Sequence, residues 1–316
     1  MSVPSLSIAF LGPKGTFSEE ALTSQEDLAE GIHIPMNDVY EVVRAVEARE
    51  ADLGIVPLEN SIEGSVNATL DALTFESKDV LIEREVVIDV DLNLLGVAGC
   101  SLDSIEVVFT HPHALAQCRS FIASNIPGAR VEAAISTADA ARRVANSGDP
   151  AQAAVATKLA AEVYGLHVIA DGIADYPDNA TRFVVLGRSV PPPSGQDKTT
   201  VVCFQAEDRP GSLLEILQEF AARSINLTKI ESRPTKKGLG QYCFFVEFEG
   251  HLSDAIVADA LKHLYVKLAD LKYLGSYPAA SSGASEHRKK LVGAWAEADA
   301  FIERLRSKME RLDARP

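Results

Sequence analysis

The stretch Ser7-Ile-Ala-Phe-Leu-Gly-Pro-Lys-Gly-Thr-Phe-Ser-Glu19 joins a short apolar run to a turn that contains two glycines. The run Ser7–Leu11 is typical of a strand, and the spacing of Thr16 and Glu19 predicts a capping box at a helix start. Such a turn can present backbone N–H groups to an anion. Its spacing matches neither the Walker A loop nor the dinucleotide fingerprint. The stretch indicates an α/β fold, in which it is either an anion-binding turn or only a helix start.

The alternation of strands and helices continues as far as Gly187. Strands are predicted at Asp52–Val56, Glu106–Phe109, Ala153–Ala156 and His167–Ile169, with helical patterns between them. This order predicts parallel α/β sheets, and a break near the long strand predicted over Glu85–Asn93 indicates two lobes. Ligands of such folds bind at the carboxyl ends of strands, which places the expected site between the lobes.

The composition limits the possible partners. Of the 316 residues 47% are hydrophobic, enough to bury at least two cores, and the formal net charge is −15. So acidic a chain has no basic field to attract nucleic acid or an anionic membrane surface, so neither is expected as a partner. An anion site must depend on local Arg side chains, helix N-termini and backbone N–H groups.

The compartment is inferred from the N-terminus and the cysteines. Met1–Phe10 has no basic start, and no later stretch is apolar for long enough to cross a bilayer, so we expect a cytoplasmic protein. The cysteines are far apart and form no CxxC pair; they are Cys100, Cys118, Cys203 and Cys243. This pattern is typical of buried thiols in a reducing compartment, so we expect neither a disulfide framework nor a zinc site.

The segment Val190–Lys198 is rich in Pro and Gly and predicts a domain boundary. Beyond it the predicted order is βαββαβ, formed by Thr199–Gln205, Gly211–Arg223, Leu227–Ser232, Gln241–Glu249, Ser253–Leu268 and Leu271–Tyr277. One face of the strand Gln241–Glu249 is strongly apolar and the other is mixed. We therefore expect helices on one face of the sheet and a free face that can pair with a partner.

A last helix is predicted over residues 286–312, after a linker of small residues. Apolar side chains follow one another at intervals of three and four, and they are Leu291, Trp295, Ala298, Ile302, Leu305, Met309 and Leu312. This narrow stripe is typical of a coiled-coil seam, so we expect it to contact a second subunit. The alternative is packing on the chain's own domains, which Phe301 favours because it widens the stripe.

Polar residues gather just past the predicted strand at residues 52–56. The segment Ile55–Asn67 carries Glu59, Asn60 and Ser61 before a glycine turn. Such a cluster at a strand end favours a binding site, although Asn60 and Glu63 also have the spacing of a capping box.

The segment Thr110–Cys118 also follows a predicted strand and starts a helix. His111 and His113 lack a partner at the usual spacing of metal ligands, so we do not expect a metal site. Thr110 is expected to cap the helix and one histidine to line the cleft.

The segment Asp178–Leu186 is the strongest candidate for chemistry. Thr181 offers a hydroxyl donor, and Arg182 offers a planar cation that can bind a carboxylate through two hydrogen bonds. The alternative is a solvated turn that leads into a strand.

Together, the runs GPKGTFSEEA, VPLENSIEGSVN, HPHALAQC and TRF, with Glu231-Ser-Arg-Pro234 further on, resemble the signatures of the prephenate dehydratase family with an ACT domain. The resemblance covers nearly the whole chain. It implies a two-lobed α/β catalytic domain of the periplasmic-binding-protein type over residues 5–189, a linker over 190–198, a ferredoxin-like ACT domain over 199–278, and the C-terminal helix. His113 stands where the family often has Gln, and Gly211-Ser-Leu-Leu214 replaces its usual Gly-Ala-Leu-Val.

The activity that the resemblance implies is decarboxylation and dehydration of prephenate to phenylpyruvate in L-phenylalanine biosynthesis, without a cofactor or metal. The implied catalytic residues are Thr181, Arg182 and Phe183, and the implied substrate-binding residues are Thr16, Phe17, Asn60, Ser61 and His111. Thr181 would donate a hydrogen bond to the leaving hydroxyl, and Arg182 would hold a carboxylate. Glu59 is expected to have a structural role.

The resemblance also implies feedback inhibition by L-phenylalanine, bound between the ACT domains of two chains in a homodimer or a dimer of dimers. The implied effector residues are Gly211, Leu213, Leu214, Asn226, Leu227, Glu231, Ser232 and Arg233. Two alternatives stay open. The substrate can be arogenate, the amino-acid analogue of prephenate, or the chain can be a non-catalytic anion-binding module with an amino-acid sensor.

Overall fold

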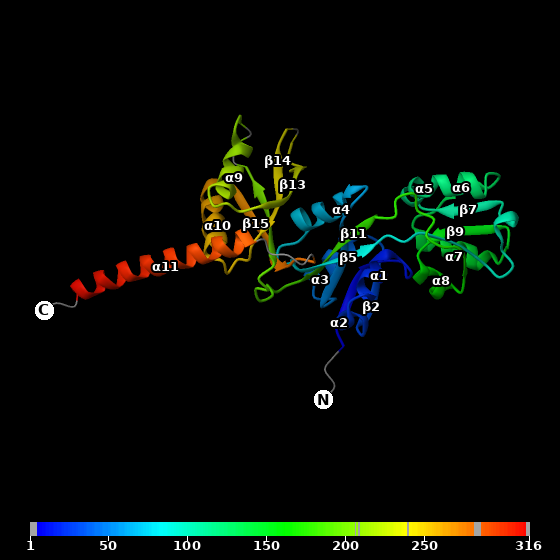
Figure 1. The fold of residues 1–316 in the computed structure, drawn as a ribbon, viewed down its shortest axis with the longest axis horizontal. Coiled ribbons are helices and arrows are strands. Elements are labelled where there is room, and N and C mark those ends of the chain that lie inside the picture. The colour runs from blue at the N-terminus through cyan, green and yellow to red at the C-terminus, as the bar shows by residue number, and fades with distance from the viewer. Residues whose placement is uncertain (1–4, 206, 208, 239, 281–285, 314–316) are drawn as a thin grey trace. The chain divides into compact units, whose positions relative to one another are not determined.

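The computed structural model describes residues 5–205, 207, 209–238, 240–280 and 286–313, and in the last helix it describes side chains for 293–295 and 297–307. The chain divides into two compact units (Figure 1). Unit 1 combines Met1–Asp79 with Val86–Gly187, and unit 2 combines Val80–Glu85 with Arg188–Pro316. A short piece from the first half of the chain therefore belongs to the C-terminal unit.

The first lobe of unit 1 is a mixed sheet of order β2-β1-β3-β11-β5, with β4 beside β3. Its strands are β1 (Ser7–Leu11), β2 (Ile32–Met36), β3 (Leu53–Asn60), β4 (Gly64–Ser65), β5 (Leu81–Asp89) and β11 (Ala180–Gly187). Its helices are α1 (Phe17–Thr23), α2 (Glu26–Ala29), α3 (Val39–Glu47) and α4 (Asn67–Asp71), the last continued by a π-turn at Ala72–Glu76. Side chains of α1 and α2 pack on Ile8, Phe10 and Ile55 of the sheet.

The second lobe of unit 1 is a sheet of order β10-β6-β9-β7-β8. Its strands are β6 (Asn93–Gly96), β7 (Val107–Thr110), β8 (Arg130–Ala133), β9 (Gln152–Ala156) and β10 (His167–Ala170). Its helices are α5 (Pro112–Gln117), α6 (Arg119–Asn125), α7 (Thr137–Ser147) and α8 (Lys158–Tyr164), with a 3-10 turn at Leu102–Ser104. Helices α5 and α6 cover one face of the sheet, and α7 and α8 cover the other (Figure 1).

The prediction of parallel sheets is correct only in part, because β1 pairs parallel with β2 and β3, and β7 with β8 and β9, but each sheet also contains antiparallel strands. Strand β11 runs antiparallel to β3, and β6 runs antiparallel to β9 and β10. The long strand predicted over residues 85–93 is also two strands, β5 and β6, in different sheets. The chain leaves the first lobe after β5 and returns to it at β11. A returning strand of this kind can enter the first sheet in the opposite direction, because no helical crossover within that sheet fixes its direction.

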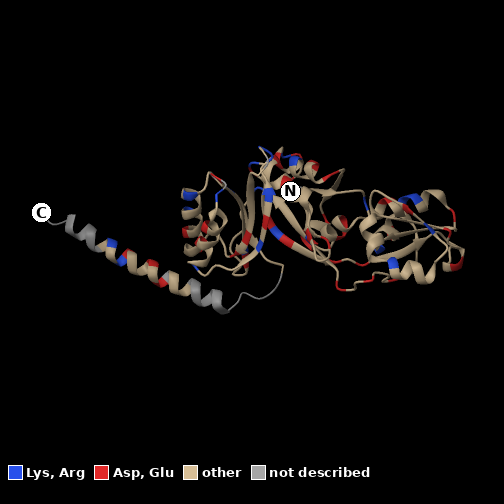
Figure 2. Cartoon of the chain, turned by 90° about the horizontal axis from the view of Figure 1, so that it is seen from above, with Lys and Arg blue, Asp and Glu red and all other residues tan. Residues whose placement is uncertain are grey.

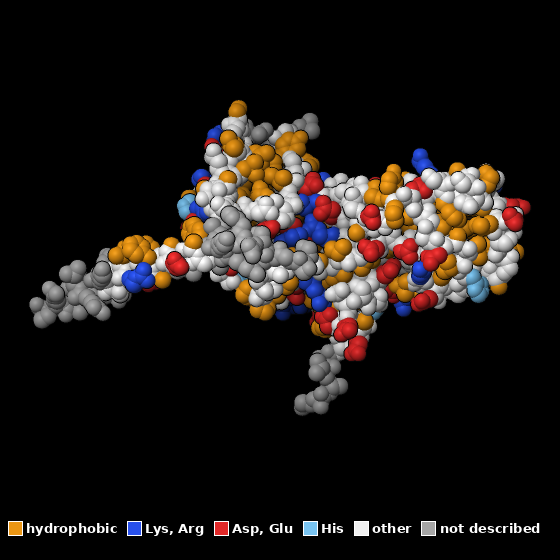
Figure 3. Space-filling model, viewed as in Figure 1, with side chains coloured by type: hydrophobic (Ala, Val, Ile, Leu, Met, Phe, Trp, Pro, Cys, Tyr) orange, Lys and Arg blue, Asp and Glu red, His pale blue; other side chains and the backbone are white. Residues whose placement is uncertain are grey.

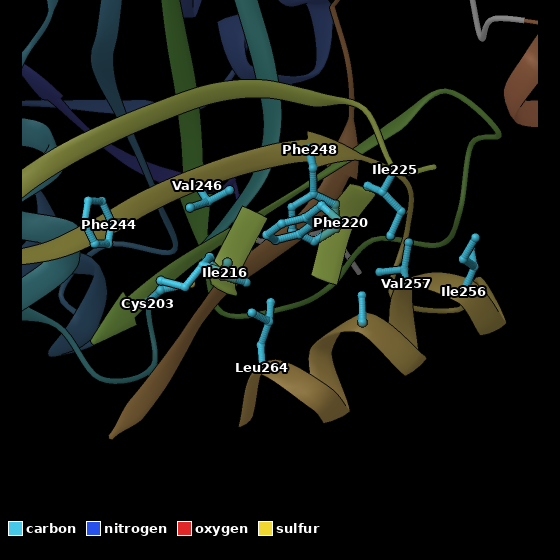
Figure 4. Packing of buried hydrophobic residues seen from close by; sticks show 12 residues of the cluster. Cys203, Ile216, Phe220, Ile225, Phe244, Val246, Phe248, Ile256, Val257 and Leu264 are labelled. Carbon is cyan, nitrogen blue, oxygen red and sulfur yellow. The ribbon is translucent and has the colours of Figure 1, made fainter. Parts of the chain in front are cut away.

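Unit 2 contains the predicted βαββαβ fold. Its elements are β12 (Asp197–Phe204), α9 (Ser212–Ala221), β13 (Leu227–Pro234), β14 (Tyr242–Glu249), α10 (Ala255–Lys267) and β15 (Asp270–Pro278). The sheet order is β13-β14-β12-β15. In the core, Phe220 of α9 meets Phe248 of β14 at a ring distance of 4.9 Å, and Leu264 of α10 points toward the same cluster (Figure 4).

The centre of the opposite face of this sheet is covered within unit 2, although Glu231 and Arg233 of β13 on that face are only partly buried, so the predicted free face is free only in part. Phe245 and Glu247 have no exposed surface. The Lys198 ammonium nitrogen lies 2.9 Å from Glu85 and 3.2 Å from Glu247, so a partly buried cation joins the end of segment 80–85 to the sheet through two buried carboxylates. A Cβ atom on Gly275 would lie 2.4 Å from the backbone oxygen of Ile82, which shows how closely the segment approaches β15.

The last helix, α11 (Glu286–Asp313), spans nearly the predicted residues. Trp295 packs against the core of unit 2. Phe301, Ile302 and Leu305 are exposed in the single chain, and Figure 3 shows apolar side chains gathered on this helix. Of the predicted stripe, the side chains of Leu291, Met309 and Leu312 lie outside the described residues.

Charged residues of both signs are interspersed along the described chain (Figure 2). No described helix combines the length and the apolarity that a membrane span requires. Burial raises the pKa of Cys118 and of Cys203 to about 12, which fits inert thiols.

Candidate active site

A pocket of about 620 Å³ in unit 1 is lined by residues of both lobes. Its polar lining comes from Thr16, Ser18, Asn60, Glu63, Ser65, Asn67, His111, His113, Gln117, Ser136, Thr137 and Thr181. Phe17 and Phe183 supply apolar surface. The start of four helices, α1, α4, α5 and α7, contributes to this lining.

The described lining of the pocket combines helix starts with the Glu63 carboxylate and contains no permanently cationic side chain. Neither Lys nor Arg occurs among the described lining residues. The first turns of helices carry partial positive charge and N–H groups without intrahelical partners. Helix starts near Phe17, Asn67 and Thr137 are groups of the kind from which the sequence predicts anion binding, and anion binding in this pocket stays a prediction.

Strands β3 and β11 bring two of the predicted motifs together. They pair antiparallel, with Thr181 opposite Asn60. The side-chain nitrogen of Asn60 donates to the Thr181 hydroxyl over 2.9 Å. Both side chains line the pocket, and Thr181 is only 9% exposed. The arrangement places a hydroxyl that is held by Asn60 in the lining of the pocket.

Arg182 does not line the pocket. The predicted role, in which Arg182 binds a substrate carboxylate, would require it to do so. Successive residues of a strand point to opposite faces, so Thr181 and Phe183 share the pocket face and Arg182 does not. Its guanidinium is 2.7 Å from the Glu59 carboxylate, and its side chain is 13% exposed. This pair gives Glu59 the structural role that was expected of it and points to a similar role for Arg182.

Ser61 is also outside the lining. Its hydroxyl accepts from the backbone N–H of Ala180 over 3.0 Å and donates to the Asn179 side-chain oxygen over 3.1 Å. Ser61 thus ties the loop after β3 to the start of β11, and it supports the pocket without facing it.

Two predicted helix caps differ in detail. Thr16 precedes α1, but its hydroxyl donates to the backbone oxygen of Leu11, and Glu19 accepts from the backbone N–H of Gly15. At α5 the capping residue is His111 rather than Thr110, because its ring nitrogen accepts from the backbone of His113.

Both histidines line the pocket. The His113 ring lies 3.2 Å from the Glu63 carboxylate, and the rings of His111 and His113 are 5.1 Å apart. Burial lowers the pKa of His111, the neighbouring His113 lowers it further, and Glu63 opposes the shift. Because Nδ1 of His111 accepts a bond, its neutral ring carries the proton on Nε2, which makes it a donor.

Several lining residues were missed by the sequence analysis, among them Gln117, Ser136 and Thr137. Gln117 lies within the segment 110–118. It is four residues after His113, so the helical period would have placed both side chains on the same face of α5. Ser136 caps α7 by accepting a hydrogen bond from the backbone N–H of Asp139, and the sequence shows this capping pattern. It was missed because the strand before it, β8, contains charged residues and was not predicted as a strand.

No group of His, Cys, Asp and Glu that could hold a metal ion occurs among the described residues. A second pocket, of about 430 Å³, lies in unit 2 beside the start of α9. It brings together the predicted effector residues Gly211, Leu213, Leu214 and Ser232, with Arg209 and Tyr242 added. Asn226, Leu227, Glu231 and Arg233 do not line it.

This fold and these sites define a class: a two-lobed α/β domain with a pocket lined by polar side chains and helix starts from both lobes, joined to a small βαββαβ domain with a pocket of its own. The prephenate dehydratase family model matches residues 8–191, and the ACT domain model matches residues 199–264. The chain belongs to the prephenate dehydratase family. The predicted fold class, a two-lobed α/β domain followed by an ACT domain, is confirmed.

Relatives support this assignment over almost the whole chain. The prephenate dehydratase of Mycobacterium tuberculosis (strain H37Rv) is 39% identical over 98% of this chain and 97% of its own. The crystal structure of prephenate dehydratase from Arthrobacter aurescens in complex with L-Phe has a TM-score of 0.86 and 39% identity, and covers 95% of this chain and 99% of its own. A solved structure described as GqqA, a novel type of quorum quenching acylases, has a TM-score of 0.78 and 31% identity, and covers 89% of this chain and 99% of its own.

Proposed function

We propose that this chain converts prephenate to phenylpyruvate, with loss of carbon dioxide and water, in L-phenylalanine biosynthesis. Membership of the family supports the reaction. The observation that assigns the reaction to particular residues is the hydrogen-bonded pair of Thr181 and Asn60 in the lining of the pocket. The homologue names describe the same activity.

The reaction needs a binding site more than it needs a strong acid. The bond from the ring to its carboxylate breaks, and its electron pair moves into the ring. The bond to the ring hydroxyl breaks in turn, and the departing oxygen takes a proton to become water. Formation of the aromatic ring drives both changes, so the protein must orient the dianion, exclude water and stabilise charge on the departing oxygen.

Thr181 is proposed to donate a hydrogen bond to that oxygen. A threonine hydroxyl is too weak an acid to be a good proton source, but a fixed hydrogen bond strengthens as negative charge develops. Asn60, Thr16 and His111, which line the pocket with it, are proposed to hold the substrate, together with the N–H groups at the helix starts. Phe17 and Phe183 would pack against the ring.

The test is turnover of purified protein with prephenate, with arogenate, and with an N-acylated amide. Phenylpyruvate formed from prephenate supports the proposal. Faster turnover of arogenate would make the chain an arogenate dehydratase, and cleavage of the amide alone would assign it a hydrolytic role. Binding of prephenate without turnover would favour a binding module.

Phenylalanine is proposed to inhibit from the pocket in unit 2. The α9 start there has Gly211 at φ +92, a left-handed conformation in which glycine allows close approach of a ligand to the backbone. Leu214→Asp should raise the phenylalanine concentration for half inhibition at least 10-fold and leave uninhibited kcat unchanged. Val266→Asp, an exposed position on α10, is the matched control. Equal inhibition of both variants would place the effector elsewhere.

The protein is further proposed to act in the cytoplasm as a homodimer or a dimer of dimers. The exposed stripe residues Ile302 and Leu305 of α11 support a contact with a second copy, because such a stripe in water costs free energy unless it is covered.

A further inference from the structure

A chain of side-chain amides behind the pocket fixes the direction of the Thr181 hydroxyl. It starts at Asn60, whose side-chain oxygen accepts from the backbone N–H groups of Ile62 over 2.9 Å and Glu63 over 3.0 Å. Backbone N–H groups can only donate, so the oxygen of the Asn60 amide must face them. Its nitrogen therefore faces β11, where it lies 2.9 Å from the Thr181 hydroxyl and 2.8 Å from the Asn179 side-chain oxygen.

Asn179 continues this chain. Its oxygen accepts from Asn60 and from the Ser61 hydroxyl, and its nitrogen donates to the side-chain oxygen of Gln117 over 2.7 Å. The side chain is 1% exposed and does not line the pocket. It therefore joins β3, the start of β11 and helix α5 without access to a substrate.

The orientation of each group follows from the one before it. The Asn60 nitrogen requires an oxygen at Asn179, and the Asn179 nitrogen requires an oxygen at Gln117. Thr181 then receives a bond from Asn60, so its own hydrogen must point away from that amide. Since Thr181 lines the pocket, this hydrogen is free to point into the pocket.

We infer that Asn179 is a positioning residue for the reaction. The backbone N–H groups decide which end of the Asn60 amide faces β11, and the Asn179 oxygen, 2.8 Å from the Asn60 nitrogen, holds that nitrogen in place beside the Thr181 hydroxyl, which is then fixed as a donor to the leaving group. This inference rests on the proposed function. A hydroxyl held in advance does not have to be reoriented as the bond breaks, and such preorganisation acts on kcat rather than on ground-state binding.

The test is a double-mutant cycle with the full-length protein. In the wild-type background, Asn179→Ala should lower kcat about 10-fold, the effect of one lost hydrogen bond of ordinary strength, and change KM less than about threefold. In the Thr181→Val background there is no hydroxyl to position, so the same change should lower kcat less than twofold.

A control separates positioning from general damage. Asn93 is also fully buried and accepts from the backbone N–H of Gly172, but it does not line the pocket. Asn93→Ala should lower kcat by one and the same factor in both backgrounds. If Asn179→Ala does not fold, Ser61→Ala removes one bond to the Asn179 oxygen and should lower kcat by two- to fivefold, again only when Thr181 is present.

Equal factors in the two backgrounds for the Asn179 or Ser61 variant would overturn the positioning role. Failure of the unmodified protein to turn over prephenate would be a different result. It would contradict the proposed function itself, on which the positioning role rests. The wild-type assay therefore distinguishes the two failures.

Discussion

The side-chain nitrogen of Asn60 lies 2.9 Å from the hydroxyl oxygen of Thr181, although the two residues are 121 positions apart in the chain. Antiparallel pairing of β3 with β11 sets them opposite each other. The contact makes Thr181 an acceptor toward the protein and leaves it a donor toward the pocket. Its hydroxyl, rather than its shape, should therefore matter for turnover.

Thr181→Val keeps the shape of the side chain and removes the donor. The kcat for prephenate should fall about 100- to 1000-fold, as is usual when a hydrogen bond to developing negative charge is lost. Thr181→Ser keeps the hydroxyl and should retain far more activity. Steady-state kinetics of both variants check this, and equal turnover of Val and Ser variants would contradict a role for the hydroxyl.

Arg182→Lys should affect stability more than substrate binding, because the guanidinium pairs with Glu59 outside the pocket. Lysine keeps the charge but loses the planar geometry, so we expect the free energy of unfolding to fall by about 1–2 kcal/mol. The KM for prephenate should stay within about twofold. Glu59→Gln should be destabilising to a similar extent. A large rise in KM with unchanged urea denaturation would instead mean that Arg182 holds the substrate.

His111 should make folding stability depend on pH. Its pKa in the folded protein is lowered by burial and by His113, and the Glu63 carboxylate only partly opposes this. A lowered pKa means that the folded state binds protons less readily than the unfolded state. The stability that the protein has when His111 is neutral is fully present above about pH 6.5 and is lost as the pH falls through the folded pKa of His111. The urea midpoint of the wild type should therefore fall more steeply between pH 7 and pH 5 than that of His111→Gln. Identical pH dependence of the two proteins would show that His111 is not responsible.

Ile302→Glu combined with Leu305→Glu should weaken self-association. Both side chains are exposed in the single chain, and charges there would have to be buried in a contact between α11 helices. Light scattering over a concentration series should show a lower mass or easier dissociation on dilution. Ala300→Glu with Ser307→Glu adds the same charge away from the stripe and serves as the control. An unchanged mass in the first double variant would mean that the stripe is not a subunit contact.

Local patterns predicted the elements well wherever one strand or helix was bounded by clear turn residues. The run Ser7–Leu11 was predicted with the bounds of β1, and the six elements of the βαββαβ domain came in the predicted order. A break between two lobes was predicted near residues 85–93, but the division of the predicted strand between two sheets was not, since an apolar pattern does not show that its two ends belong to different sheets.

The candidate site was predicted in part. Thr16, Asn60, His111 and Thr181 line one pocket as expected. Thr16 and His111 follow β1 and β7, and Asn60 and Thr181 are paired at the adjacent ends of β3 and β11. The opposite orientation of Arg182 could have been inferred from strand alternation, which separates neighbours such as Thr181 and Arg182. The role of Asn179 could not, because it depends on bonds to Asn60 and Gln117, whose distances in the chain are 119 and 62 residues.

Segment 80–85 has a consequence for protein engineering. This piece of β5 belongs to unit 2, where Glu85 meets Lys198, while the rest of the strand belongs to unit 1. A chimaera that exchanges the regulatory domain at residue 188 would place this piece against the sheet of another protein. The buried Glu85 carboxylate would then lose its partner, Lys198. Recombination between relatives should therefore succeed only when segment 80–85 travels with the C-terminal half, so the two units are not interchangeable modules even though a linker separates them.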